Sequence, residues 1–244
     1  MKLIIISDTH CTQPDVPDGD VLIHCGDHTY QGNVLESEHS LTWLNSLPHR
    51  HKIIIAGNHE MGWEKDLRSN YYRPPHKFHY KPKHLNRFPD LIYLHHTGIE
   101  IDGIKFWGSP YQPYFMNWAF QFQRGPQAEE LWSHIPEDTD VLITHGPPYG
   151  LGDINERDER FGDEDLLARV LEVKPIIHCY GHAHAGYGER FYEGIHFINA
   201  ALLNEDYMLA NKPVVVDLEP VCSHCNLECR GTCSRARAES EEIA

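Results

Sequence analysis

The chain has 244 residues, of which 41% are hydrophobic and 11% aromatic, the composition of a folded globular protein. This length suits one sizeable α/β domain better than two small ones. The formal net charge of −15 argues against a broad basic surface for duplex DNA or RNA, so nucleic acid is not an expected partner. A small phosphate substrate is not excluded, because bound divalent cations would reverse the local potential.

The sequence contains no apolar run that approaches the roughly 18 residues of a membrane span. The run Leu3–Ile6 ends at Ser7 and is shorter than the about 7–15 apolar residues that an exported leader needs. We therefore expect a cytoplasmic protein without a membrane partner, whose seven cysteines are reduced.

The first elements in chain order follow a strand, helix, strand pattern. The apolar runs Leu3–Ser7 and Asp20–Cys25 predict parallel strands that are buried on both faces. Apolar residues at helical spacing predict a helix at Asn33–Ser46, and the next apolar run predicts a third strand at His51–Ala56. This order is the signature of a βαβ unit and of the α/β fold class.

The elements expected after the third strand are shorter, and the polar segment 60–89 is expected to hold a short helix near Lys65–Asn70. Further strands are expected at Leu91–Leu94, Ile99–Ile101, Ile104–Trp107, Asp140–Thr144, Pro175–Tyr180, Arg190–Tyr192, His196–Ile198 and Val214–Leu218, and helices at Gln127–His134 and Asp163–Glu172, the last capped by Asp163. Asp102-Gly103 and Glu193-Gly194 predict hairpin turns. The composition shifts after about Pro220, so we expect a packed domain over residues 1–220 and a cysteine-rich tail over residues 221–244.

Short polar motifs follow the apolar runs and carry most of the functional information. They are Asp8-Thr9-His10, Gly26-Asp27, Gly57-Asn58-His59-Glu60, Thr144-His145-Gly146, Gly181-His182-Ala183-His184 and Asn199-Ala200. Open α/β sheets hold their ligands at the carboxyl ends of their strands. Carboxylate, imidazole and amide groups suit a pair of divalent metal ions that bind phosphate oxygens. Chance matches are the alternative, because histidine is abundant at 19 residues, but the ordered set favours a metal site.

The order D-x-H, G-D, G-N-H-E, H-G and G-H-x-H resembles that of the calcineurin-like metallophosphoesterase superfamily. A narrower likeness, to its metallophosphoesterase-domain-containing branch, covers most of residues 1–218 and is carried by Trp107–Tyr114, Asn117–Phe120, Arg124-Gly125, Ile143–Pro148 and Gly181–Gly188. The resemblance implies a four-layer α/β/β/α sandwich with mixed sheets and a binuclear metal site at the strand ends.

The resemblance also implies a role for each motif residue. The first metal ion would be held by Asp8, His10 and His184, the second by Asn58, His145 and His182, and Asp27 would bridge both through its two carboxylate oxygens. A hydroxide shared by the two ions would attack phosphorus in line with the departing alkoxide. His59 would be the catalytic residue that protonates the leaving oxygen or stabilises its charge, and Glu60 would orient a ligand.

Two positions bear on how closely the chain follows this family pattern. Some animal members of the branch carry Gly where this chain has His182 and are weak enzymes, so the ligand set of the second metal is complete here. His28 follows the expected bridging residue, at a position where relatives commonly have an apolar side chain. It either points away into a loop or adds a polar group near the site.

Four residues outside the ligand set are candidates for substrate binding. Tyr111 and Trp118 belong to an aromatic segment, which either packs as a cover of the core or forms a stacking wall for a nucleobase or aryl ester. Arg157 and Arg160 lie in a charge-rich loop. They either contact a substrate phosphate bidentately or are solvated and paired with acidic neighbours.

The tail carries four cysteines outside the region of resemblance: Cys222, Cys225, Cys229 and Cys233. Four thiols could hold one structural zinc ion or, more remotely, an iron–sulfur cluster. Their spacing matches neither the usual zinc-ribbon pair nor the bacterial ferredoxin run. The alternatives are a flexible reduced tail, and disulfides or redox switching.

The leading hypothesis is a metal-dependent phosphodiesterase or phosphomonoesterase that hydrolyses small phosphate esters, with cyclic nucleotides indicated by the resemblance. The alternatives are a nuclease, and a nucleotide- or metal-binding regulator with little turnover. The two sites could hold Mn, Fe, Zn, Co or Ni, because mixed imidazole and carboxylate ligands accept all of these ions.

Overall fold

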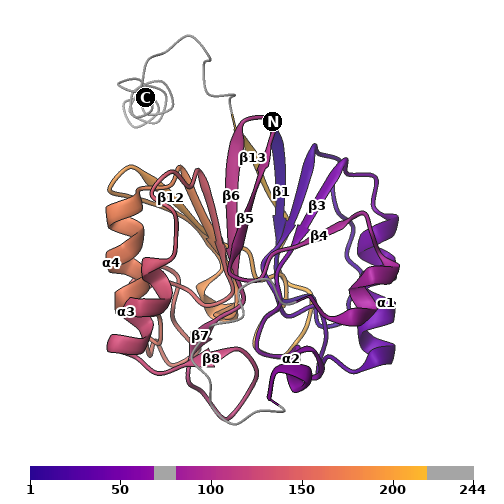
Figure 1. The fold of residues 1–244 in the computed structure, drawn as a ribbon, viewed down its shortest axis with the longest axis horizontal. Helices are drawn as coiled ribbons and strands as arrows, with labels where there is room; N and C mark the ends of the chain where they lie inside the picture. The colour runs from indigo at the N-terminus through magenta and orange to yellow at the C-terminus, as the bar shows by residue number, and fades with distance from the viewer. Residues whose placement is uncertain (69–80, 219–244) are drawn as a thin grey trace.

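The computed structural model describes residues 1–68 and 81–218 of the chain, and its strands form two large mixed sheets and one small one (Figure 1). The first sheet has the strand order β13-β1-β2-β3-β4, and the second has the order β11-β12-β10-β9-β6-β5. The strands β7 and β8 pair with each other in the small sheet.

The elements have the following bounds. The first sheet consists of β1 (Lys2–Ile6), β2 (Val21–His24), β3 (His51–Ile54), β4 (Leu91–Tyr93) and β13 (Val214–Asp217). The second consists of β5 (Thr97–Ile101), β6 (Ile104–Ser109), β9 (Val141–Thr144), β10 (Ile177–Tyr180), β11 (Gly188–Tyr192) and β12 (Ile195–Asn199), and the small sheet of β7 (Gln112–Pro113) and β8 (Gln121–Phe122). The α-helices are α1 (Val34–Ser46), α2 (Met61–Arg68), α3 (Pro126–Ser133) and α4 (Glu164–Val173), and Lys83–Arg87 and His184–Gly186 are short 3₁₀ helices.

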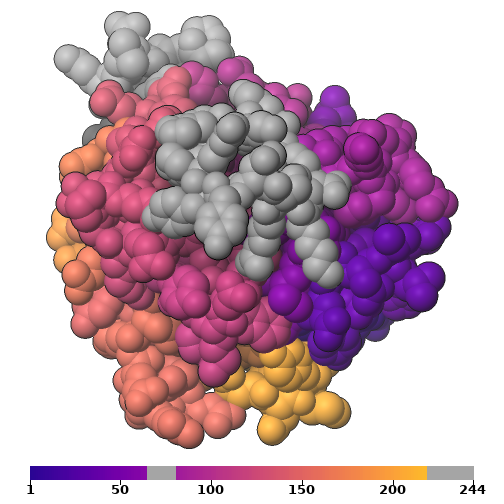
Figure 2. Space-filling model, turned by 60° about the horizontal axis from the view of Figure 1, so that its bottom comes forward, coloured from indigo at the N-terminus to yellow at the C-terminus, as the bar shows by residue number. Residues whose placement is uncertain are grey.

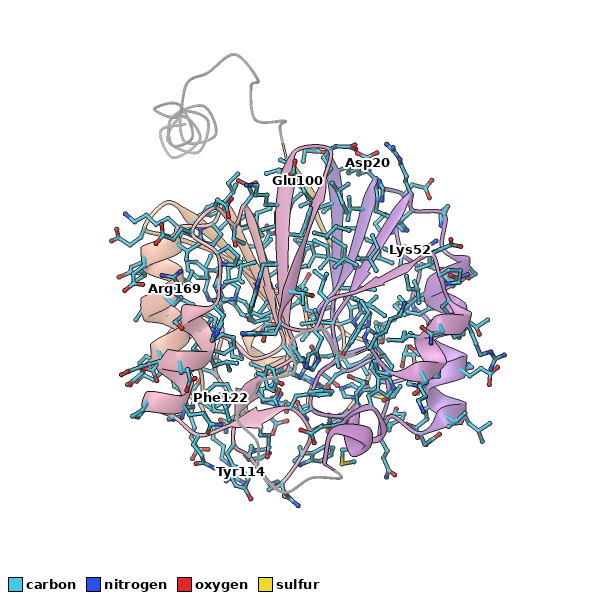
Figure 3. All side chains as sticks on the ribbon, viewed as in Figure 1. Asp20, Lys52, Glu100, Tyr114, Phe122 and Arg169 are labelled. Carbon is cyan, nitrogen blue, oxygen red and sulfur yellow. The ribbon has the colours of Figure 1, made fainter. Side chains whose placement is uncertain are left out.

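Most strands run parallel within their sheet, which brings the loops that follow them to one end of the molecule. β1 to β4 are parallel to one another, and so are β6, β9, β10 and β12. The antiparallel strands β13, β5 and β11 lie at sheet edges. Figure 3 labels Asp20, which precedes β2, at the upper end, and Tyr114, which follows β7, at the lower end. The carboxyl ends of the parallel strands therefore meet at the lower end.

Alternate residues of the strands face different layers, as the two-residue period of a strand requires. Leu3 and Ile5 of β1 lie in a core between the two sheets. Ile4 and Ile6 face the other way and pack in the cluster that includes α1. Leu142 of β9 packs in the cluster that includes α3 and α4. The four-layer α/β/β/α sandwich implied by the resemblance is thus confirmed, with α1 outside one sheet and α3 and α4 outside the other (Figure 1).

Polar side chains cap α1 and α4 at their first turns. Oδ1 of Asn33 accepts the N–H of Glu36 at 3.0 Å, and Oδ1 of Asp163 accepts the N–H of Leu166 at 2.7 Å. Asp163 is therefore the cap that the sequence predicts. The same Oδ1 also accepts the indole N–H of Trp132 at 2.8 Å, which ties the start of α4 to α3.

Both predicted hairpin turns are confirmed. φ is 49° and 82° at Asp102 and Gly103, and 49° and 76° at Glu193 and Gly194. Positive φ at both central residues is what a two-residue hairpin turn requires. The turns join β5 to β6 and β11 to β12.

One predicted helix begins earlier than expected, and some short elements are not predicted at all. The helix expected near Lys65–Asn70 begins earlier, at Met61. Trp63 explains this start, because its buried indole donates Nε1–H to the Ser37 hydroxyl of α1 at 2.7 Å and so fixes the first turn. The β7–β8 pair and the 3₁₀ helices have no period long enough for the sequence to reveal.

In the portion of the chain that is described, no helix has the length and apolar character needed to cross a bilayer. The expected boundary near residue 220 and the tail at 221–244 lie outside the described residues. The zinc site of the tail therefore stays a prediction.

Candidate metal centre

The side chains expected to bind metal come from loops that follow parallel strands of both sheets. Asp8 and His10 follow β1, Asp27 follows β2, Asn58 follows β3, His145 follows β9, and His182 and His184 follow β10. Among the described residues, three overlapping sets place their ligand atoms within 4.8 Å of one another: Asp8, His10 and His184; His10, Asp27 and His59; and Asp27, His145 and His182. The structure thus brings residues that lie far apart in the sequence into one cluster.

The carboxylate of Asp27 lies at the centre of this cluster. Its Oδ2 is 3.4 Å from Nε2 of His145, 3.9 Å from Nε2 of His10 and 4.0 Å from Nε2 of His59. Its Oδ1 accepts the backbone N–H of His59 at 2.8 Å. Oδ2 of Asp27 thus faces three imidazoles, whereas Oδ1 accepts a backbone N–H.

The remaining expected ligands lie on two sides of Asp27. On one side, Nε2 of His184 is 3.4 Å from Oδ1 of Asp8, and the Asp8 carboxylate accepts the backbone N–H of His182 at 3.0 Å. On the other side, Oδ1 of Asn58 lies 2.8 Å from Nε2 of His145. Each side contains groups from both sheets, so the cluster spans the seam between them.

Backbone carbonyls orient four histidines of the cluster. Nδ1 of His10 bonds to the carbonyl of Thr29 at 3.0 Å, that of His59 to Tyr30 at 2.8 Å, that of His145 to Cys25 at 2.9 Å and that of His184 to Asn204 at 2.9 Å. A carbonyl can only accept, so each Nδ1 carries a hydrogen. In the neutral ring Nε2 then keeps its lone pair and presents it to the cluster, as metal-binding histidines do.

The donor set fits a divalent cation. Nε2 of His10 is buried, and within the described part of the chain it has no hydrogen-bond partner. Leaving such an atom without a partner costs about 1–3 kcal/mol. Nε2 of His145 faces two oxygens, from Asn58 and Asp27, which would repel its lone pair unless a proton or a cation lay between them. Imidazole, carboxylate and amide ligands are those that the first-row divalent metals accept.

Electrostatics divides the cluster into neutral and charged groups. Burial lowers the pKa of His10 to about 4 and keeps that imidazole neutral. Burial acts in the same direction on His145 and His184, but Asp27 beside His145 and Asp8 beside His184 raise their pKa values to about 9. Burial alone would raise the pKa of Asp27, yet His145 beside it holds this pKa well below its usual range. Metal ions binding here would displace protons from His145 and His184.

The backbone that carries the ligands takes conformations that non-glycine residues rarely adopt. φ is 54° at Asp8, 40° at His10, 56° at Asp27 and 65° at His182. Each such residue costs on the order of 1–3 kcal/mol, and such strain concentrates at functional sites. These positive φ values turn the backbone sharply out of the strands, so that the side chains enter the cluster.

Two glycines of the motifs are required by close approach. A Cβ at Gly57 would lie 2.3 Å from Oδ1 of Asp27, and one at Gly181 would lie 2.0 Å from Oδ2 of Asp8. Both distances are far shorter than any real contact. The glycines before Asn58 and His182 therefore make room for the two carboxylates.

Glu60 holds the ligand loops together and does not belong to the three candidate sets. Its Oε2 accepts the N–H groups of Asp27 at 3.0 Å and Gly57 at 2.7 Å. Its Oε1 accepts the N–H of Thr29 at 3.0 Å and the hydroxyl of Thr29 at 2.8 Å. Burial and the Asp27 carboxylate raise the pKa of Glu60, and these donors oppose that rise. The contacts agree with the orienting role expected from the sequence.

His28 points away from the cluster. It is fully buried, and its ring stacks on that of Trp63 at 5.6 Å and lies tilted against that of His24 at 4.0 Å between centroids. The ring therefore belongs to none of the three candidate sets, but it packs in the interior and not in a loop as the first alternative expects.

Of the two aromatic residues expected to contact substrate, Trp118 lies at the site and Tyr111 does not. The ring of Trp118 is 4.2 Å from that of His59. Tyr111 is half-buried and packs against the core, where its hydroxyl lies 3.4 Å from Nε2 of His95 and its ring is 6.1 Å from that of Phe120. Burial raises the pKa of Tyr111. Tyr111 thus follows the alternative reading, as part of the core cover.

The two arginines lie in the loop between β9 and α4. Arg160 donates to Oδ1 of Asp153 at 2.6 Å, and Asp153 also accepts the N–H groups of Gly150 and Gly162. The guanidinium of Arg160 therefore fixes this loop, in line with the alternative of pairing with an acidic neighbour. Arg157 is exposed in the same loop.

Two aromatic residues of the site are not predicted by the sequence analysis. The ring of Tyr30 is 5.6 Å from that of His10, and the ring of Tyr207 is 4.8 Å from His10 and 5.5 Å from His184. Tyr30 could have been found from its place shortly after Asp27 in a motif loop. Tyr207 belongs to no motif, so nothing in the sequence connects it with the cluster.

Comparison with known proteins agrees with this geometry. Residues 1–186 match the model of the calcineurin-like phosphoesterase family. The proteins called metallophosphoesterase domain-containing protein 1 in human and mouse are each 38% identical to the chain over 230 residues, covering 89% of this chain and 71% of theirs. The crystal structure of TT1561 from Thermus thermophilus covers 81% of this chain and 88% of its own, with a TM-score of 0.51 at 10% identity, which supports the fold alone.

The fold and the cluster at its strand ends are those of a metallophosphoesterase. The chain belongs to the calcineurin-like phosphoesterase family. At the level of this family it is a metal-dependent phosphoesterase, with His and Asp groups that could bind metal.

Proposed function

We propose that the protein is a two-metal hydrolase of small phosphate esters, acting on monoesters or diesters in the cytoplasm. The observation that carries the proposal is the surroundings of Asp27, whose Oδ2 faces His10 from one ligand group and His145 from the other. The proposed ligands are Asp8, His10 and His184 for one ion, and Asn58, His145 and His182 for the other, with Asp27 shared.

Two divalent ions, when bound, would supply Lewis acidity toward the phosphoryl oxygens and a nucleophile near neutral pH. The chain supplies the geometry. Asp27 holds the two ligand groups together, and the backbone carbonyls of Thr29, Cys25 and Asn204 keep the imidazoles aimed at them. Because this orientation exists in the folded backbone, little reorganisation accompanies the reaction.

His59 is the proposed general acid. Its Nδ1–H donates to the carbonyl of Tyr30 at 2.8 Å, so Nε2 faces the cluster. Nε2 lies 4.0 Å from Oδ2 of Asp27, within the cluster. In the proposed reaction, the protonated ring would donate from Nε2 to the alkoxide that leaves from phosphorus.

The finer features of the proposal rest on composition and resemblance. The net charge of −15 favours a small substrate over a nucleic acid. Cyclic nucleotides are the phosphodiesters that the resemblance indicates, and Mn, Fe, Zn, Co or Ni would suit the donors. Manganese is the ion we would add first.

An assay of the full chain on bis-p-nitrophenyl phosphate and on cyclic nucleotides, with added Mn²⁺, tests the proposal. We expect turnover by the unchanged protein. In Asp27→Asn we expect loss of turnover and of the joint binding of two metal ions, because an amide carries no charge to share between them. Asp90→Asn, at an exposed position, is the matched control and should behave like the unchanged protein.

Absence of turnover with each of the divalent ions would overturn the proposal. Tight nucleotide binding without turnover would instead favour the regulator with little activity.

A further inference from the structure

Three aromatic rings surround the face of the cluster that His10 and His59 present. The rings belong to Tyr30, Trp118 and Tyr207. Ring centroids are 5.6 Å apart for Tyr30 and His10, 4.2 Å for Trp118 and His59, 4.8 Å for Tyr207 and His10, and 6.1 Å for Tyr30 and Tyr207. We call these three residues the aromatic slot.

Each ring of the slot is held by the backbone that also holds a residue of the cluster. The carbonyl of Tyr30 accepts Nδ1–H of His59. The residue after Trp118 donates its N–H to the carbonyl of Asn58 at 3.1 Å. The N–H of Tyr207 donates to the carbonyl of Asn204 at 2.9 Å, and this carbonyl also accepts Nδ1–H of His184. The slot is therefore fixed relative to the cluster.

Tyr207 sits on a turn built to present it. Oδ1 of Asn204 accepts the N–H groups of Asp206 at 3.1 Å and Met208 at 2.9 Å, and φ of Tyr207 is 58°. A bulky side chain at positive φ is strained, and such strain persists where the surrounding structure imposes it, often at ligand sites. The turn thus spends conformational energy to place an aromatic ring over His10.

Two of the three rings are open to solvent, Trp118 is half-buried, and none of the three residues is acidic or basic. Tyr30 is 43% exposed and Tyr207 is 41% exposed, although their rings lie against the buried imidazole of His10. Figure 2 shows one face of the molecule on which the yellow segment near the end of the described chain borders the indigo N-terminal segment. Exposed aromatic faces that line a site offer flat apolar contact area at low entropic cost, because few torsions must be fixed.

We propose that the aromatic slot binds a flat aromatic group carried by the phosphate ester, with Tyr207 as the residue that selects it. This inference rests on the proposed function, because it places the phosphate at the metal cluster. Stacking on an aromatic side chain tolerates many ring chemistries, so the slot selects the class of ester group and not one compound.

The test is a binding comparison that needs no turnover. Phenylphosphonate and methylphosphonate both carry a phosphonate whose C–P bond the Mn²⁺-loaded protein cannot hydrolyse. The group on phosphorus is a flat ring in the first and a methyl group in the second. Titration calorimetry gives the ratio of the methyl to the phenyl Kd. We expect a ratio of about ten or more for the unchanged protein, as for a single stacked ring.

Variants of the slot residues show whether the aromatic slot causes this ratio of Kd values. Tyr207→Ala should bring the ratio close to one with unchanged metal content, whereas Tyr207→Phe keeps the ring and should keep the ratio. Tyr30→Ala, whose backbone carbonyl still holds His59, should lower it as well and serves if Tyr207→Ala fails to fold. Tyr192→Ala is the matched control, since Tyr192 is 46% exposed and lies at the hairpin end of β11.

The same proteins are assayed on bis-p-nitrophenyl phosphate, which tests the proposed function separately. A ratio of phosphonate Kd values that Tyr207→Ala and Tyr30→Ala leave unchanged would overturn the slot, and turnover of this ester would leave the proposed function standing. Failure of the unchanged protein to bind either phosphonate and to hydrolyse the ester would overturn both.

Discussion

Nε2 of His28 donates a hydrogen bond of 2.6 Å to the backbone carbonyl of Ile55. His28 follows Asp27 directly, and Ile55 lies between β3 and the Gly57-Asn58 pair. One buried bond therefore connects two loops that carry proposed ligands. Burial lowers the pKa of His28 to about 4, so the ring is neutral and its single N–H is committed to this bond.

Replacement His28→Leu should lower stability without removing metal. Leucine leaves the Ile55 carbonyl without this donor, and we expect a loss of about 1–3 kcal/mol in the free energy of unfolding. Urea unfolding and metal analysis measure the two effects, with His39→Leu, at an exposed position of α1, as the control. Metal loss at unchanged stability would contradict this reading and would mean that His28 acts on the cluster itself.

Replacement Glu60→Gln should damage the cluster although it preserves shape. Both oxygens of Glu60 accept hydrogen bonds, from Asp27 and Gly57 on one side and from Thr29 on the other. In either orientation the NH₂ group of glutamine meets donors, which costs about 1–3 kcal/mol. Calorimetry should show weaker Mn²⁺ binding than in Glu156→Gln, at an exposed position. Equal affinities would show that the carboxylate has no orienting role.

Replacement His59→Ala should separate chemistry from metal binding. Metal content should be retained, and kcat should fall by about 10²- to 10⁴-fold, as for loss of a general acid. The fall should be largest for esters with poor leaving groups, which need a proton most. The measurement is kcat across aryl phosphodiesters of increasing leaving-group pKa, with His39→Ala as the control. A uniform loss across the series would argue against proton donation.

His178 should make stability depend on pH. Burial lowers the pKa of this histidine to about 3, and its Nε2–H donates to the Thr144 hydroxyl at 2.9 Å. Because the folded pKa lies below the unfolded one, the stabilisation is present above about pH 6.5 and is lost as the pH falls toward 3, by up to about 1.4 kcal/mol per pH unit.

The check is urea unfolding of the metal-free protein at pH 5 and pH 7. His178→Phe should show a smaller loss of stability between these values than the unchanged protein. His39→Ala, which removes an exposed histidine, should leave the dependence as it is. Identical slopes in all three proteins would refute the assignment to His178.

The sequence predicts buried strands with polar residues at their ends because both depend on strong local signals, whereas the four-layer sandwich and the ligand set were implied by the family resemblance. Buried parallel strands give continuous apolar runs, such as Leu3–Ile6, and a polar residue directly after such a run lies at the sheet edge. The glycines at positions 57 and 181 mark places where the backbone closely approaches a carboxylate. These features are encoded within a few residues of one another.

Features that depend on distant contacts were not predictable in the same way. Tyr207 reaches His10 through a turn that Asn204 builds, and no period or motif marks that turn. Tyr111 and Trp118 stand in one aromatic segment, yet one packs against the core and the other against His59. Only the three-dimensional path of the segment decides which ring faces which way.

The carbonyls that orient His10, His59, His145 and His184 have a consequence for how these loops can vary. A carbonyl belongs to every residue type, so exchanging the side chain at position 25 or 30 leaves the corresponding bond available. Inserting or deleting one residue would instead shift the carbonyl by several ångströms and rotate the imidazole away from its ion. The loops around this centre should therefore tolerate amino-acid substitutions at such positions but not insertions or deletions.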